Sequence, residues 1–173
     1  KVTTGATPTV TLQRDRRLYT VSARLVVCAD GRHSQGRAAA GFPVQREPAQ
    51  LAVAGLLFTD LAAPTDAISV FINPRHPGQF ASFFPLGNAR HRIYFIYSLQ
   101  GQERRLCGLH NVPPFIHECV QSGVPTGWFA TGAPAGPLAM HHALRTWVES
   151  PSRPGIVLVG DAAATTNPSF GCG

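Results

Sequence analysis

Residues 156–163 read Ile-Val-Leu-Val-Gly-Asp-Ala-Ala, an apolar run that stops at Gly160 and Asp161. A strand with apolar side chains on both faces is typical of a parallel sheet that helices cover on its two sides. Ligands of open α/β sheets bind beyond the carboxyl ends of such strands, which is where Asp161 lies. The sequence therefore predicts a covered strand over 156–160 and a ligand-binding turn directly after it.

A second stretch near the N-terminus, residues 25–34 (LVVCADGRHS), repeats this arrangement. Its apolar run ends at Asp30 and Gly31. A carboxylate at a strand end can accept hydrogen bonds from sugar hydroxyls, and a glycine after it lets the backbone approach a ligand closely. Two such strand ends in one chain indicate a nucleotide site. Asp-Gly pairs are also common in turns and caps, so a purely structural role for Asp30 stays open.

The residues between these stretches predict a β-rich middle region. Four apolar runs are separated by turn signals, and their short spacing predicts an antiparallel sheet. These runs cover residues 51–58, 68–72, 79–86 and 92–97. A helix is expected over 113–122, because its prolines fit a first turn and Gly123 ends it. Trp128 is expected to be a core or interface anchor.

Shorter elements are expected on either side of this region. Period-two alternation over 10–12 and 17–22 predicts a hairpin with one buried face. Residues 34–40 are typical of a short helix. The glycines and prolines of 131–139 indicate a linker, whereas residues 141–149 fit either a strand or a helix.

The composition excludes several classes of protein. The 173 residues are 44% hydrophobic and 14% charged with a net charge of +6, and no apolar run is long enough to span a membrane. The basic residues are scattered rather than gathered in a stripe, so no nucleic-acid binding is expected. The irregular spacing of the cysteines favours a reduced, cytoplasmic protein. A metal site at Cys107-x-x-His110 and His117-x-Cys119 is a distant alternative.

The end of the chain extends the first motif. Small residues follow Asp161, and then come Pro168 and the run Gly171-Cys172-Gly173. The two glycines of that run would bring bare backbone N–H groups up to a ligand, and a helix starting there would favour an anionic group.

These motifs resemble those of the FAD-dependent aromatic-hydroxylase family, which has the para-hydroxybenzoate hydroxylase fold. Residues 156–163 with Pro168 and Gly171-x-Gly173 are similar to its second flavin motif, and residues 25–34 with Arg37 are similar to its Asp-Gly motif. The resemblance implies a mixed α/β fold with α+β character. This would be a partial FAD/NAD(P)-binding fold of hydroxylase type with an antiparallel β-sheet substrate domain.

The same resemblance implies how the chain divides. Residues 1–46 would be the C-terminal part of the first FAD-domain segment, which carries the Asp-Gly motif. Residues 47–148 would form the β-sheet substrate domain, and residues 149–173 would return to the FAD domain with the Gly-Asp motif.

The resemblance further implies how FAD would be held. The Asp161 carboxylate would bind a ribityl hydroxyl, and Pro168 would lie beside the isoalloxazine. The backbone that approaches the pyrophosphate and the ribityl chain would come from Gly160, Ala162 and Ala163. Backbone contacts to the flavin ring would come from Gly171, Cys172 and Gly173. A motif associated with both FAD and NAD(P)H binding would comprise Asp30, Gly31 and Arg32.

The activity implied is that of a monooxygenase: NAD(P)H reduces the flavin, and one oxygen atom of O₂ enters a small organic substrate, aromatic or otherwise apolar. No catalytic side chain and no metal are assigned. A flavin reductase or halogenase of the same fold, or a non-catalytic binding module, is the alternative. Halogenases of this fold need an active-site lysine, and Lys1 is the only lysine here.

Three departures from the family pattern bear on this expectation. The Gly-x-Gly-x-x-Gly dinucleotide motif is absent, and the chain stops before the helix expected after Gly173. Ala164 stands where many members have histidine, and Cys172 stands where glutamine is usual. The expected explanation is a partial chain, inactive alone, whose complete form binds FAD.

Overall fold

The computed structural model describes residues 1–76, 78–99 and 105–166, which form two compact units. Unit 1 comprises Lys1–Pro48 and Leu144–Gly173, so the chain leaves it and later returns. Unit 2 is the continuous segment Ala49–Ala143.

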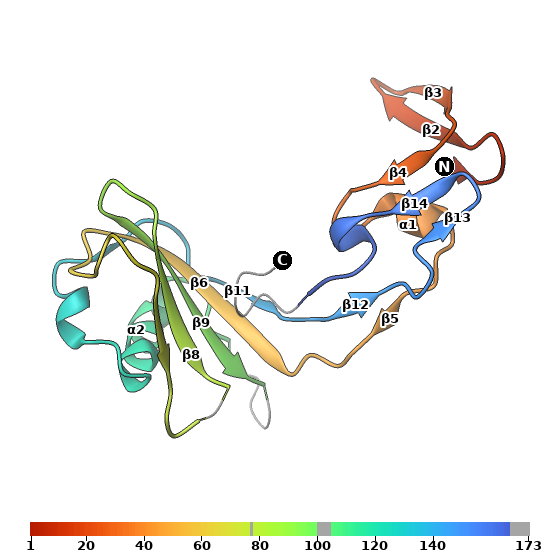
Figure 1. Ribbon diagram of the computed structural model, residues 1–173. Coiled ribbons are helices and arrows are strands. Elements are labelled where there is room, and N and C mark those ends of the chain that lie inside the picture. The colour runs from red at the N-terminus through yellow and green to blue at the C-terminus, as the bar shows by residue number, and fades with distance from the viewer. Residues whose placement is uncertain (77, 100–104, 167–173) are drawn as a thin grey trace. The chain divides into compact units, whose positions relative to one another are not determined.

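A small sheet at the centre of unit 1 confirms the predicted parallel strands. Strand β14 (Ile156–Leu158) pairs in parallel with β4 (Val26–Cys28), and β13 (Ser152–Arg153) pairs antiparallel on the other edge of β14. Two short helical elements follow the parallel strands, α1 (Gln35–Ala39) after β4 and the 3₁₀ turn η3 (Gly160–Ala162) after β14 (Figure 1). The core of this unit consists of Cys28, Phe42, Val148, Ile156, Leu158 and Ala162.

The prediction that both faces of these strands are covered is wrong for one face of β4 among the described residues. Helix α1 packs closely on one side, where a Cβ added to Gly36 would lie 2.5 Å from the Cys28 sulfur. On the other side Val27 is 54% exposed and Leu25, just before the strand, is 53% exposed. The physical reason is that Val27 lines an open pocket of unit 1 and is not covered by a helix.

The predicted N-terminal hairpin is confirmed, but its buried face is not. Strands β2 (Thr9–Arg14) and β3 (Arg17–Ser22) pair antiparallel, with β1 (Val2–Thr3) added to β2. The turn residues Asp15 and Arg16 both have positive φ, at 48° and 64°, as the tight two-residue hairpin loop requires. Every residue of β3 is exposed, whereas the first half of β2 is partly buried and Val2 of β1 packs against the core of unit 1.

Unit 2 confirms the predicted antiparallel sheet. Its strand order is β10-β6-β9-β8-β7, with β11 also pairing with β6. Figure 1 labels four of these strands, β6, β8, β9 and β11. The central pair, β6 (Leu51–Thr59) and β9 (Arg90–Ser98), runs in register from Leu51↔Ser98 to Thr59↔Arg90. The neighbouring strands are β8 (Phe80–Pro85) and β7 (Ser69–Ile72).

The predicted helix is confirmed as α2 (Val112–Gln121), and one face of the sheet packs with it in the main core. Phe83, Phe95 and Phe115 are at most 1% exposed there, and full burial of each such side chain contributes about 1.5–3 kcal/mol. Trp128 lies edge-on to Phe83 with ring centroids 5.3 Å apart, which confirms its expected role as a core anchor. It belongs to the 3₁₀ element η2 (Thr126–Phe129), and η1 (Leu109–Asn111) precedes α2.

The expectation of a linker over 131–139 is wrong. Strand β10 (Ala133–Pro134) pairs with the end of β6, and β11 (Ala139–His142) pairs with its beginning, so the backbone of this stretch is used by the sheet. The chain then re-enters unit 1 through β12 (Thr146–Trp147), which pairs with β5 (Gln45–Arg46). None of the helices among the described residues is long and apolar enough to cross a membrane.

Candidate functional site

The two predicted strand ends meet at one edge of the unit 1 sheet. Leu158, the last residue of β14, is the Cα partner of Cys28, the last residue of β4. Asp30 follows β4 by two positions and Asp161 follows β14 by three. Because the strands are parallel, both acidic turns emerge on the same side, where open α/β sheets bind their ligands.

Arg37 joins these two turns. Its side chain is buried, and its Nη2 donates to the Arg32 carbonyl at 2.7 Å. Its Nη1 donates to the carbonyls of Ala162 at 2.9 Å and Asp161 at 3.5 Å. The guanidinium therefore fixes the turn after β4 against the turn after β14. The sequence offered one signal for this contact, the place of Arg37 in the Asp-Gly motif, which gave it no role.

Asp30 is hydrogen-bonded to the first residues of helix α1. Its carboxylate accepts hydrogen bonds from the Ser34 hydroxyl and from the Gly36 N–H, the latter at 2.9 Å. Burial acts to raise the pKa of Asp30, but the hydrogen bonds from Gly36 and Ser34 outweigh it and hold the pKa below its ordinary value. Ser34 in turn is the N-cap of α1 and accepts from the Arg37 N–H at 2.9 Å. Contact of Asp30 with a cofactor stays a prediction; its structural contacts are those of a capping residue.

Asp161 is placed differently. Its side chain is exposed in the first turn of η3, and no described residue pairs with its carboxylate. Gly160 before it has φ of +57°, with open space where a Cβ would be. Ala162 after it is completely buried and anchors the turn. The turn thus presents a free carboxylate that can accept from hydroxyls, beside the first N–H groups of a helical turn, which have no acceptor inside it.

Some of the remaining predicted cofactor-binding residues can be placed in the structure, and others lie outside the described residues. Gly31 has φ of +77° and open space where a Cβ would be, whereas the backbone of Ala163 is used internally, donating to Gly160 and accepting from Val148. A pocket of about 420 Å³ opens beside Asp30, between β1, β2, β4 and α1, and Val27 lines it. Four predicted contacts lie outside the described residues: Pro168, Gly171, Cys172 and Gly173.

The described residues contain no candidate metal site. No group of three or more histidine, cysteine or acidic side chains there could hold a metal ion. Burial raises the pKa of the Cys28 thiol, and the nearby charge of Asp30 raises it further. Cys119 in the unit 2 core is also buried, and burial raises its pKa strongly. Neither thiol is therefore prepared to act as a thiolate.

A parallel strand pair with an acidic turn at each carboxyl end, whose two strands are separated in the chain by a large antiparallel sheet, has the arrangement at which open α/β sheets bind their ligands. The chain belongs to the FAD binding domain family, which it matches over residues 2–173. No curated protein sequence matches it.

Solved structures share the fold. The flavin-dependent halogenase CmlS has a TM-score of 0.72 at 15% identity, covering 95% of this chain and 30% of that chain. Aklavinone-11 hydroxylase, in a ternary complex with FAD and aklavinone, has 0.68 at 20% identity, covering 96% and 31%. The anhydrotetracycline hydroxylase OxyS from Streptomyces rimosus has 0.63 at 14% identity, covering 96% and 32%. This chain thus spans about a third of each of those chains.

Proposed function

We propose that this chain is the part of a flavin-dependent monooxygenase that binds FAD at the joined strand ends of unit 1. Unit 2 would be its substrate domain. The observation that carries the proposal is the exposed carboxylate of Asp161, which pairs with no described residue. It lies on a turn that the buried Arg37 guanidinium ties to the turn after β4. Membership of the FAD binding domain family supports FAD as the cofactor.

The residues fit this cofactor in chemical terms. The Asp161 carboxylate would accept a hydrogen bond from a ribityl hydroxyl. Gly160, with no side chain in the way, would let the dinucleotide lie close to the backbone. Arg37 would not contact FAD; its role is to hold the Asp161 and Ala162 carbonyls. Asp30, Gly31 and Arg32 would form the other wall, and Pro168 with residues 171–173 would complete the flavin side.

FAD, once bound, would supply the redox chemistry, with NAD(P)H as reductant and O₂ as the source of the inserted oxygen. In the balanced overall reaction, a substrate with a C–H bond, O₂, NAD(P)H and a proton would give the hydroxylated product, NAD(P)⁺ and water. The chain's own contribution would be binding, orientation and the exclusion of water. The cytoplasm is the compartment we propose for this reaction, in keeping with three free cysteines among the described residues.

The sheet of unit 2 supports an aromatic or apolar substrate. Because side chains alternate along a strand, Phe84 and Tyr94 point away from the face that buries Phe83 and Phe95. Both are only partly buried, and their rings meet edge to face at 5.8 Å. The Tyr94 ring lies over Gly55, where an added Cβ would come within 2.9 Å of it. We propose this face of the sheet as the substrate wall.

Halogenation is the second candidate, because the fold matches a halogenase as well as it matches hydroxylases. The lysine that halogenases of this fold need has one candidate in these residues, Lys1. A flavin reductase or a non-catalytic binding module is the remaining alternative.

Spectroscopy and turnover of the complete protein test the proposal. We expect a flavin absorbance spectrum, FAD rather than FMN on release, and oxidation of NADH or NADPH that an aromatic substrate accelerates. A protein that neither retains FAD nor binds added FAD would contradict the proposal. FAD binding with halide-dependent product formation would replace monooxygenation by halogenation.

A further inference from the structure

The turn that carries Asp161 is followed at once by a short antiparallel pairing with the returning segment of the chain. The N–H of Val148 donates to the Ala163 carbonyl at 2.9 Å, and the N–H of Thr165 donates to the Thr146 carbonyl at 2.8 Å. Between these bonds Ala164 forms an isolated bridge with Trp147. All of these contacts lie inside unit 1. The chain beyond Asp161 is thus fastened to the strand β12.

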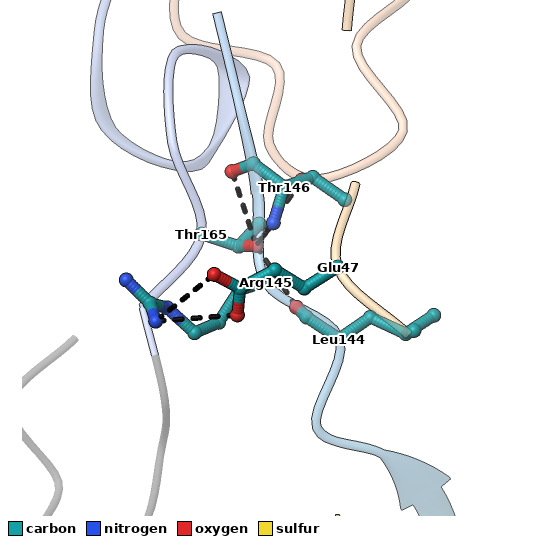
Figure 2. Close-up of polar contacts among 5 residues, drawn as sticks. All are labelled: Glu47, Leu144, Arg145, Thr146 and Thr165. Atoms are coloured by element: carbon teal, nitrogen blue, oxygen red, sulfur yellow. Dashed lines mark hydrogen bonds and ion pairs between the residues drawn. The ribbon is translucent and has the colours of Figure 1, made fainter. Parts of the chain in front are cut away.

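The hydroxyl of Thr165 is the centre of this pairing (Figure 2). Thr165 is 5% exposed, and its Oγ1 accepts from the Thr146 N–H at 2.8 Å. It lies 3.1 Å from the Thr146 hydroxyl and donates to the Leu144 carbonyl at 3.0 Å. Valine has nearly the same shape but could make none of these bonds. This buried hydroxyl therefore ties the segment after Asp161 to two backbone groups of the returning chain.

The returning segment also makes an exposed ion pair, which differs from the buried contacts of Thr165. The Nη1 of Arg145 lies 3.2 and 3.3 Å from the two carboxylate oxygens of Glu47 (Figure 2), and both side chains are about half exposed. Exposed ion pairs of this kind contribute little to stability because water screens them. Glu47 therefore offers a matched control, since its removal breaks a polar contact of the same segment and leaves Thr165 untouched.

We propose that Thr165 is a positioning residue for the FAD site, an inference that rests on the proposed function. Asp161 has no described partner for its carboxylate, so its position depends on how its turn is held. Arg37 holds that turn at the Asp161 and Ala162 carbonyls, and Thr165 holds it three to four residues further along. Without the Thr165 hydroxyl the turn samples other positions. The apparent affinity for FAD then falls in proportion to the fraction of molecules that keep the binding arrangement.

The test compares Thr165→Val, Thr165→Ser and Glu47→Gln in the complete protein, using FAD titration of the apoprotein and urea unfolding. We expect Thr165→Val to raise the Kd for FAD about tenfold or more, since a buried donor and acceptor lose their partner. Thr165→Ser should stay within about twofold of the unmutated protein because it keeps the hydroxyl. Glu47→Gln should leave the Kd unchanged. Should Thr165→Val not fold, Thr146→Val removes only the hydroxyl–hydroxyl contact and should raise the Kd by a smaller factor.

Two results would overturn this inference alone. One is a Thr165→Val protein, or its substitute Thr146→Val, that unfolds more easily but binds FAD as tightly as before, since Thr165 would then be merely structural. The other is a Thr165→Ser protein as impaired as Thr165→Val, since the methyl group rather than the hydroxyl would then matter. An unmutated protein that binds no FAD would overturn the proposed function itself, and this inference with it.

Discussion

Arg37 contributes to the site through three backbone carbonyls from two separate turns. An ammonium is a compact point charge and cannot reproduce the planar fork that reaches all of them. We expect Arg37→Lys, and more strongly Arg37→Leu, to lower the free energy of unfolding, for Leu by about 2 kcal/mol, because buried carbonyls lose their donors. Urea unfolding measures this loss. Arg153→Leu is the control, since its bonds to the Ala40 and Gly41 carbonyls are exposed; an equal loss in both variants would contradict a special role for Arg37.

The contribution of Asp30 to the free energy of unfolding can be measured from its dependence on pH. Its pKa is lowered in the folded protein, so its contribution is fully present above the unfolded value of about 3.9 and is lost as the pH falls through the lower folded-state value. Asp30→Asn resembles the protonated form. We therefore expect it to be less stable than the unmutated protein at pH 7, with a difference that shrinks as the pH falls below about 3.9. Unfolding curves across this range check the difference, and Asp66→Asn, on an exposed bend, serves as control. A difference that does not change with pH would contradict the assignment.

For single residues, the sequence correctly placed Asp30 and Asp161 at one edge of the sheet. Two apolar runs that pair in parallel bring their carboxyl ends, and the residues after them, to the same edge. The sequence left open whether Asp30 has a structural role, and it could not predict that Asp30 is hydrogen-bonded to the start of α1 while no described residue pairs with the Asp161 carboxylate. That difference depends on Ser34 and Gly36, whose contacts with Asp30 arise only when α1 folds back onto β4.

Helix α1 and strand β4 approach each other so closely that only glycine fits between them. A Cβ on Gly36 would lie 2.5 Å from the Cys28 sulfur. We expect Gly36→Ala to cost about 1–3 kcal/mol of unfolding free energy, because the core has no room for the added carbon. Adding Cys28→Ala should recover part of this loss, and a double-mutant cycle from urea unfolding measures the coupling. Strictly additive effects would contradict the close contact.

Elements with strong periodic patterns were the ones that the sequence predicted well. The strands around 51–58 and 92–97, the helix over 113–122 and the hairpin all form within a residue or two of the expected bounds. The error at 131–139 has a physical cause: β10 contains Pro134 and lies at the edge of the sheet, where proline is tolerated, so composition alone does not separate it from a linker.

The division of the chain into two units predicts that each has its own core. Phe83 is buried among Phe71, Phe129 and Trp128 in unit 2. We expect Phe83→Ala to cost about 3–5 kcal/mol, and the added amide hydrogen exchange to be confined to residues 49–143. Mass spectrometry of peptides from both units checks this. Equal loss of protection in unit 1 would contradict separate cores.

For the whole molecule, contacts between residues far apart in the sequence were the ones that could not be predicted. The contacts of Thr165 with Leu144 and Thr146 span about twenty residues, and those of Arg37 with η3 join the two ends of the chain. The place of Arg37 in the Asp-Gly motif was the one sequence signal, and it gave no partner, because both sets of contacts arise from the way the chain leaves unit 1 and returns.

The affinity of the complete protein for FAD with and without the Asp161 carboxylate tests the central claim most directly. We predict that Asp161→Ala raises the Kd for FAD at least about tenfold, the loss of a charge-assisted hydrogen bond of about 1.5–3 kcal/mol. Stability should scarcely change, because no described residue pairs with that exposed carboxylate. The control Asp66→Ala should bind FAD normally. Unchanged FAD affinity in Asp161→Ala would contradict the assignment of this strand end as the flavin site.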